Sequence, residues 1–324
     1  MAKLLTKRVF GKALIGVLCL GVWTCQGGET LPAYKQQSGV AGSVNAVGSD
    51  TLNNLMSYWA EAFRAIYPNV TIQVEGKGSS TAPPALAAGA AQIGPMSRLM
   101  KASEIEDFEK KRGFKPTAIA VAIDCVAVYV NKDNPIEGMS LPQLDAVFSS
   151  TRKLNHSDTG NWGQLGLTGD WSARNISMYG RNAASGTYTF FKEEALGNGD
   201  YKNSVKEQPG SAAVVNGIAS DRAGIGYSGI GYKTSEVRAL PIAVKDGGSF
   251  VEPDFANAID GSYPLARLLV VYVPKDPNQP LPAATLEFLK YVLSKEGQEI
   301  VERDGYGALP LDVLREQLRL LGVE

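Results

Sequence analysis

The stretch Ile176–Leu196 reads ISMYGRNAASGTYTFFKEEAL, and it indicates the fold class. Its first residues, Ile176–Tyr179, read as a short strand, and Tyr188–Leu196 reads as a helix. The loop between them, Arg181–Thr187, has the order Arg-x-x-x-Ser-Gly-Thr. A strand that leads through a short loop into a helix is the building unit of an α/β protein.

The same alternation of strands and helices extends over the rest of the chain. Strand-like segments are Ser43–Val47, Val70–Val74, Thr117–Val130 and Leu265–Val273, with a strand pair at Gly224–Tyr232. Helical segments are Thr51–Tyr67, Thr81–Ala91, Ser103–Lys111, Val214–Ser220 and Ala283–Arg303. This order predicts an α/β fold with largely parallel sheets.

Length and composition exclude several classes of protein. A chain of 324 residues is long enough for two lobes. Its composition, with 44% hydrophobic and 20% charged residues, excludes wholesale disorder. The 32 basic residues balance 33 acidic ones without a basic block, which argues against nucleic acid as a partner. Three cysteines exclude a disulfide framework, and the single histidine, His156, excludes a multi-histidine zinc site.

The N-terminus has the pattern of an export signal. Four basic residues precede an apolar run, Ala13–Trp23, which is too short to span a bilayer comfortably. We predict a signal peptide over 1–24 and a Gly/Gln/Ser/Pro-rich tether over 25–42; the alternative is a buried N-terminal strand or helix. The residues before Cys25 partly match a lipoprotein cleavage box, so Cys25 is a candidate lipid anchor. Without lipid it could pair with Cys125, although we expect Cys125 to be buried and unpaired in its apolar strand.

Three of the predicted helices are entered by loops of glycine and small hydroxyl residues, at Gly48–Thr51, Gly76–Thr81 and Arg181–Thr187. The start of a helix presents unpaired N–H donors and a partial positive charge, and glycine allows close approach of a ligand. Such loops bind small oxyanions. The alternative is ordinary N-capping by Ser, Thr or Asp, and for Arg181 a surface ion pair.

Taken together, these loops resemble those of the periplasmic phosphate-binding proteins of phosphate-specific ABC transporters. The order and spacing of Gly48–Leu52, Gly76–Thr81, Gly94–Met100, Arg181–Thr187, Gly224–Tyr227 and Tyr263–Leu265 carry the resemblance, which covers residues 43–310. It implies a two-lobed periplasmic-binding-protein fold of type II, an α/β fold in which each lobe is a mixed sheet flanked by helices. Two crossing strands, near Cys125–Val130 and Tyr263–Val270, would join a first lobe of 43–125 plus 262–324 to a second lobe of 126–261.

The resemblance also implies a function. The chain would be an exported, periplasmic solute-binding protein, a monomer without enzyme activity or cofactor, that captures inorganic phosphate and delivers it to an inner-membrane ABC transporter permease. The implied phosphate-binding residues are Ser49, Asp50, Thr51, Leu52, Ser79, Ser80, Ser97, Arg98, Arg181, Ser185, Gly186 and Thr187.

One position departs from the family pattern. Ser97 stands where the best-known members carry an aspartate that accepts the phosphate proton and so excludes sulfate. Arg98 could add a second guanidinium, and Asp50 could supply the acceptor, unless it is only the N-cap of Thr51–Tyr67. Sulfate or an organic phosphate therefore stays open as the ligand.

Two other classes of function are kept as alternatives. The first is a phosphate-ester hydrolase that uses Ser185 or Ser79 as its nucleophile, and the second is an adhesin or regulator with the same fold. His156 is interpreted as a solvated loop residue. Gly224–Gly229 matches G-x-G-x-x-G by letter only, because a helix is expected before it and a strand, Ile230–Tyr232, after it.

Overall fold

The structure, a computed structural model, describes residues 31–323. The predicted signal peptide over 1–24, the candidate lipid anchor Cys25 and residues 25–30 of the predicted tether lie outside the described residues. Over 31–323, every helix is too short or too polar to cross a membrane.

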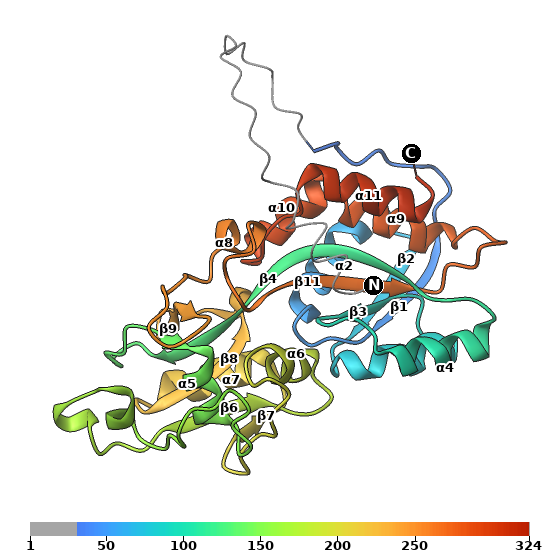
Figure 1. The fold of residues 1–324 in the computed structure, drawn as a ribbon. Coiled ribbons are helices and arrows are strands. Elements are labelled where there is room, and N and C mark those ends of the chain that lie inside the picture. Colours follow the sequence, from blue (N-terminus) through green and yellow to red (C-terminus); the bar gives the residue numbers. More distant parts are fainter. Residues whose placement is uncertain (1–30, 324) are drawn as a thin grey trace, which may run out of the picture.

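A single mixed sheet runs through both halves of the molecule (Figure 1). Its strands follow the order β3 (Gly94–Met96), β11 (Ala266–Val273), β4 (Thr117–Asn131), β8 (Gly224–Gly229), β6 (Ser177–Arg181) and β7 (Lys206–Gln208), and β9 (Val237–Leu240) also pairs with β4. Within this sheet, β6 pairs in parallel with β8 and with β7, and all other strand pairs are antiparallel. The prediction of largely parallel sheets is therefore wrong, because the chain leaves the first lobe along β4 and returns along β11 in the opposite direction.

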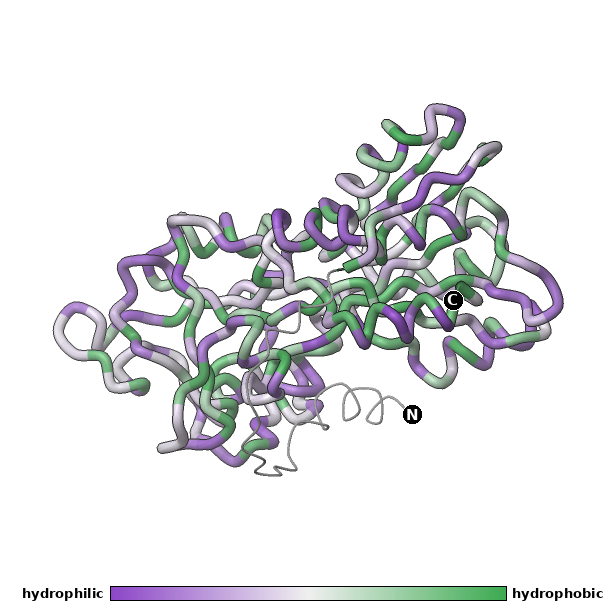
Figure 2. The backbone as a smooth tube through the Cα atoms, turned by 90° about the horizontal axis from the view of Figure 1, so that it is seen from above, coloured by the Kyte–Doolittle hydropathy of each residue, from purple (hydrophilic) through white to green (hydrophobic). Residues whose placement is uncertain are grey.

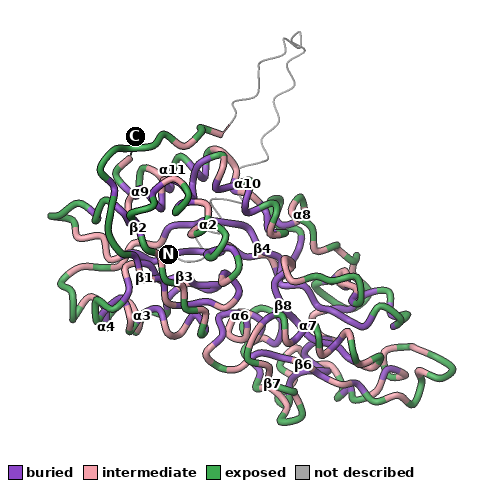
Figure 3. The backbone as a smooth tube through the Cα atoms, turned by 180° about the vertical axis from the view of Figure 1, so that it is seen from behind, coloured by how far each residue is buried: buried purple, intermediate pink, exposed green. Residues whose placement is uncertain are grey.

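The long strand β4 joins the two lobes. Its first part, Thr117–Cys125, pairs with β11, and its second part, Val126–Asn131, pairs with β8 and β9. Residues 119–131 of β4 are all buried, so both faces of the strand are covered, which explains why its apolar run is nearly continuous. Figures 2 and 3 show this centre of the molecule as hydrophobic and buried. Cys125 lies in this strand and is buried, as predicted, and it has no disulfide partner within 31–323. We call 31–125 with 262–323 the first lobe and 126–261 the second lobe.

The first lobe adds a parallel strand pair and six helices to the sheet. The strands are β1 (Gly42–Val47) and β2 (Val70–Glu75), and the helices are α2 (Asn53–Ile66), α3 (Ala82–Ala87), α4 (Ala102–Arg112), α9 (Ala283–Val292), α10 (Lys295–Arg303) and α11 (Leu311–Leu321). The predicted helix 283–303 is in fact two helices, because the Ser294 side chain accepts a hydrogen bond from the Gly297 N–H and starts a new helix there.

The second lobe contains α5 (Leu141–Phe148), α6 (Gly186–Glu194), α7 (Ser211–Ser220), α8 (Phe255–Ile259) and a small pair of strands, β5 (Met139–Ser140) and β10 (Ile242–Ala243). Residues 230–232, predicted as strand, form the 3₁₀ turn η4 (Ile230–Tyr232). The turn brings Gly231 against the first lobe, where an added Cβ would lie 2.7 Å from the carbonyl oxygen of Asp304. His156 lies in a loop and contacts the carbonyl of Ser157, as interpreted from the sequence.

The described part of the predicted tether is not free. The Tyr34 hydroxyl lies 2.7 Å from both the Tyr67 hydroxyl and a Glu287 carboxylate oxygen, and the Lys295 N–H donates to the Pro32 carbonyl. Aromatic packing of Tyr34 on Phe63 also holds this segment on the first lobe.

Candidate functional site

In the second lobe, strand β6, the loop that follows it and helix α6 present polar groups toward the first lobe. β6 ends at Arg181, and α6 begins at Gly186. The Ser185 hydroxyl oxygen accepts hydrogen bonds from the N–H groups of Thr187 and Tyr188, at 3.1 and 3.4 Å, and so caps the helix. Because this oxygen is the acceptor, the Ser185 hydroxyl proton stays available to a ligand. Gly186 opens the helix, and the first N–H of a helix has no partner within it.

Three loops of the first lobe meet at one point. The Ser97 hydroxyl lies 3.1 Å from the Ser49 hydroxyl and 3.2 Å from the Ser79 hydroxyl, and the Ser97 N–H donates to Ser79 Oγ at 3.0 Å. All three serines are buried. The loops predicted from the sequence therefore converge, although Ser49 and Ser97 are 48 residues apart.

These loops contact the second lobe directly. The Thr51 and Thr187 hydroxyls lie 3.0 Å apart, and the Ser80 N–H donates to the Ala184 carbonyl at 3.1 Å. A Cβ on Gly186 would lie 2.4 Å from Ser79 Oγ, closer than real Cβ contacts allow. Glycine at this position is what permits the two lobes to close, and the structure shows them closed.

Arg181 is buried at the junction of the lobes, with 2% of its surface exposed. Its Nη1 donates to the Ser211 hydroxyl at 2.7 Å, and its Nη2 lies 3.2 Å from Asp50 Oδ2. Burial lowers the pKa of the guanidinium, and Asp50 partly opposes this shift. Among the described residues, Arg181 Nε has no hydrogen-bond partner. An unpartnered buried donor on a cation is a place where a bound anion supplies the missing acceptor.

Asp50 belongs to the contact between the lobes and does not cap α2. Its Oδ2 accepts the Ser211 N–H at 2.8 Å, in addition to facing Arg181. The residue at the N-cap of α2 is Leu52, and no side chain caps that helix. The N-cap alternative for Asp50 is therefore wrong, because the carboxylate points across to the second lobe.

Arg98 does not contribute its guanidinium to this cluster. Both terminal nitrogens bond the Glu104 carboxylate at 2.7 Å, and Nη2 also donates to the Ser80 hydroxyl at 3.1 Å. The second guanidinium expected at Arg98 is thus held by Glu104 within the first lobe. The prediction followed from adjacency in the sequence to Ser97, which does not fix where a long side chain points.

Sequence reasoning missed Arg267 and Asp124. The Arg267 Nη2 donates to the Thr187 hydroxyl at 3.0 Å and to Asp124 Oδ2 at 2.7 Å. Both residues are buried in strands that are otherwise apolar, β11 and β4. The sequence does contain a signal for this pair. One acidic residue in an apolar strand and one basic residue in another indicate that the two charges are buried together.

The chain is similar to known proteins over most of its length. A model of the PBP superfamily domain matches residues 33–296. The phosphate-binding protein PstS of Pseudomonas aeruginosa strain PAO1 is 53% identical over 294 residues, which is 90% of this chain and 91% of that protein. This chain belongs to the PstS family of phosphate-binding proteins.

More distant members of the PstS family agree. PstS of Staphylococcus haemolyticus is 27% identical over 314 residues, covering 94% of this chain and 95% of that protein. Among solved structures, a protein of Clostridium perfringens described as a phosphate ABC transporter substrate-binding protein, with bound phosphate, superposes with a TM-score of 0.69 at 26% identity. That match covers 83% of this chain and all of the other, so the two-lobed periplasmic-binding-protein fold is confirmed.

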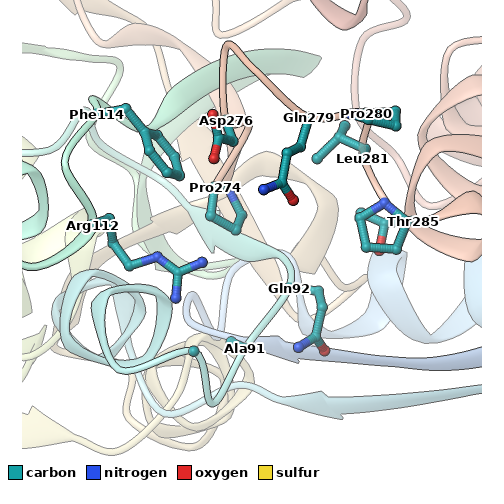
Figure 4. A pocket seen from close by; sticks show the side chains of 12 residues that line it. Ala91, Gln92, Arg112, Phe114, Pro274, Asp276, Gln279, Pro280, Leu281 and Thr285 are labelled. Carbon is teal, nitrogen blue, oxygen red and sulfur yellow. The ribbon is translucent and has the colours of Figure 1, made fainter.

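Two of the cavities in the described part of the chain bear on where a ligand could bind. One, of about 300 Å³, lies at the end of the first lobe where β11 ends, between Arg112, Phe114, Gln92 and Gln279 (Figure 4). The other, of about 500 Å³, lies in the second lobe and is lined by Arg181, Tyr188, Lys192 and their neighbours. The converging loops, and not the first cavity, bring the helix starts and Arg181 together.

Proposed function

We propose that this chain captures inorganic phosphate between its two lobes and delivers it to an ABC transporter permease. The observation that carries this proposal is the meeting of Arg181, whose buried Nε has no partner among the described residues, with helix starts from both lobes. The PstS relative and the phosphate-bound neighbour support the same ligand.

The proposed ligand-binding groups are neutral donors together with one arginine. They are Ser49, Thr51, Leu52, Ser79, Ser80 and Ser97 from the first lobe and Arg181, Ser185, Gly186 and Thr187 from the second, with Asp50 holding Arg181 in place. The body over 25–324 carries 28 basic and 33 acidic groups, so long-range attraction is not what recruits an anion. Oriented N–H and O–H dipoles in a closed, dry site are sufficient to bind a small anion.

Binding requires the lobes to separate and close again. In the closed arrangement the site groups bond one another, as the Thr51 and Thr187 hydroxyls do at 3.0 Å. A bound anion replaces these bonds with contacts to both lobes and so favours the closed state. The hinges are β4 and the segment that leads into β11, because these two connections cross between the lobes.

A phosphate-ester hydrolase has less support. The Ser185 hydroxyl oxygen is occupied as a helix cap, and the Ser79 hydroxyl bonds the Ser97 N–H and hydroxyl. None of these partners accepts a proton as a general base does. Incubation with a chromogenic phosphate ester tests this alternative, since turnover abolished by Ser185→Ala would favour the enzyme.

The remaining parts of the proposal concern location and assembly. We propose export to the periplasm with an optional lipid anchor at Cys25, and a monomer as the binding unit. Mass spectrometry of the membrane fraction would show whether Cys25 carries lipid, and the protein in the soluble fraction should then have lost residues 1–24.

The experiment that tests the ligand is titration calorimetry of the exported form with phosphate, arsenate and sulfate. We expect phosphate and arsenate to bind with one anion per chain and sulfate to bind more weakly. Sulfate binding as tight as phosphate binding would contradict phosphate selectivity, and the absence of heat with all three anions would contradict anion capture.

A further inference from the structure

A buried ion pair lies between the two strands that connect the lobes. Asp124 of β4 and Arg267 of β11 are directly opposite in the antiparallel register. Arg267 donates from Nε at 2.9 Å and from Nη2 at 2.7 Å to Asp124 Oδ2. Exposed surface is 0% for Asp124 and 4% for Arg267, so both charges are removed from water.

The remaining donors and acceptors of this pair reach both sides of the anion site. Arg267 Nη1 donates to the Ser97 carbonyl at 2.8 Å, in a loop of the first lobe. Its Nη2 also donates to the Thr187 hydroxyl at 3.0 Å, and its guanidinium lies 5.3 Å from the centre of the Phe190 ring, both on α6 of the second lobe. Asp124 Oδ1 accepts the N–H of Ile230, also in the second lobe.

These contacts set the direction of a hydroxyl proton. Because the Thr187 oxygen accepts from Arg267, its own proton is directed to another acceptor. In the structure the Thr51 hydroxyl lies 3.0 Å away across the interface, and either hydroxyl of that pair can be the donor. With an anion in the site, the same proton is available to it. Arg267 therefore prepares Thr187 as a donor without needing to touch the ligand.

The energetics of the pair favour such a role over a purely stabilising one. Removing two charges from water is repaid only when the geometry is good and further hydrogen bonds satisfy both groups. Here those further bonds to Arg267 and Asp124 come from both lobes, and they are complete only when the lobes are closed. The Arg98–Glu104 pair, by contrast, bonds groups of the first lobe only.

We infer that Arg267, oriented by Asp124, is a positioning residue that couples closure of the lobes to the arrangement of the anion site through Ser97 and Thr187. The inference rests on the proposed phosphate-binding function. It predicts that the pair controls how far phosphate closes the protein, and not only how stable the protein is.

The test compares the exported wild type with three variants. Arg267→Lys keeps the charge but cannot bond Asp124, Ser97 and Thr187 together. The double variant Asp124→Asn with Arg267→Gln removes both charges, so no unpaired buried charge opposes its folding. The matched control is Glu287→Gln, which changes an ion pair with Lys290 in α9, away from the site. Phosphate affinity is measured by titration calorimetry, closure by the change in radius of gyration in X-ray scattering, and stability by urea unfolding.

We expect both Arg267 variants to bind phosphate about 10- to 100-fold more weakly, the range found when a group that orients a metal-binding side chain is removed. We also expect a smaller compaction at saturating phosphate, which a merely structural role would not change. Glu287→Gln should bind and close as the wild type does.

Wild-type affinity and compaction in the double variant would overturn the inference and leave the proposed function standing. Because that variant carries no charge at positions 124 and 267, it decides the matter if Arg267→Lys fails to fold. A wild type that does not bind phosphate would instead contradict the proposed function itself.

Discussion

The two lobes build their sides of the anion site in different ways. The second lobe uses one continuous segment, Arg181–Thr187, which supplies a guanidinium, two hydroxyls and the start of α6. The first lobe uses three separate loops, whose serines Ser49, Ser79 and Ser97 meet only in the folded protein. A continuous segment is fixed by one strand and one helix, whereas three loops require the whole first lobe to be in place.

This difference has consequences for mutation. The first lobe divides its contribution among neutral hydroxyls that bond one another, so the loss of one leaves two in place. The second lobe concentrates charge and close approach in single residues. Substitutions in Arg181–Thr187 should therefore weaken binding more than substitutions in any one loop of the first lobe.

Arg181→Met tests this difference most strongly. The change removes the buried cation and leaves Asp50 without its partner, so we expect phosphate binding to weaken by about 100-fold or more, the range for truncating one member of a buried charge pair. Titration calorimetry measures the effect. Arg222→Met is the control, because that arginine pairs with Asp133 at the surface. An Arg181 variant that binds within a few-fold of the wild type would show that the second lobe does not dominate.

Gly186→Ala should have the next largest effect. Its Cβ would lie 2.4 Å from Ser79 Oγ and 2.6 Å from Ser97 Oγ, so the lobes could not close fully. We expect about 10- to 100-fold weaker binding with little change in the urea midpoint, because alanine suits the first turn of a helix. Gly160→Ala is the matched control, since a Cβ there meets nothing within 4 Å. Equal affinities for the two variants would contradict a requirement for close approach at Gly186.

The same difference explains how much the sequence could predict. The strand, loop and helix around Arg181 were predicted to within two residues at each boundary because local propensity and spacing define them. The convergence of the three first-lobe loops followed from the family resemblance and not from periodicity. The partner of the Arg98 guanidinium could not be predicted either, since only the fold shows that Glu104 holds it.

Arg267 was missed for a related reason. Its partner Asp124 is 143 residues away, and only strand register places them opposite each other. The mixed pairing of the sheet could not be read from alternating strands and helices either, because strand direction depends on how the chain crosses between the lobes. Local elements were thus predictable, and long-range partners were not.

Asp50→Asn examines the link between the two sides of the site. Asp50 comes from the first lobe but bonds Arg181 and Ser211 of the second, so an amide should weaken the hold on the guanidinium. Ser97 stands where an aspartate would accept the phosphate proton, so Asp50 is the remaining candidate acceptor. In Asp50→Asn we therefore also expect the ratio of phosphate affinity to sulfate affinity to fall several-fold, about the effect of one hydrogen bond. Competition titrations measure both. Unchanged competition by sulfate would refute a role for Asp50 in selectivity.

Asp304→Asn should have the smallest effect on phosphate binding, because Asp304 approaches the second lobe at Gly231 through its backbone carbonyl, which the substitution leaves in place. Burial raises the pKa of its carboxyl from 3.8 to about 6. Between these values the folded protein binds more protons than the unfolded chain, so stability falls as the pH rises through this window. The variant stays neutral and should unfold at higher urea than the wild type at about pH 7.5, but not at about pH 4. A gain that persists at the lower pH would show that ionisation is not the cause. If the stabilised variant binds phosphate with unchanged affinity, the Asp304 carboxyl affects the stability of the protein and not the two sides of the site that bind the anion.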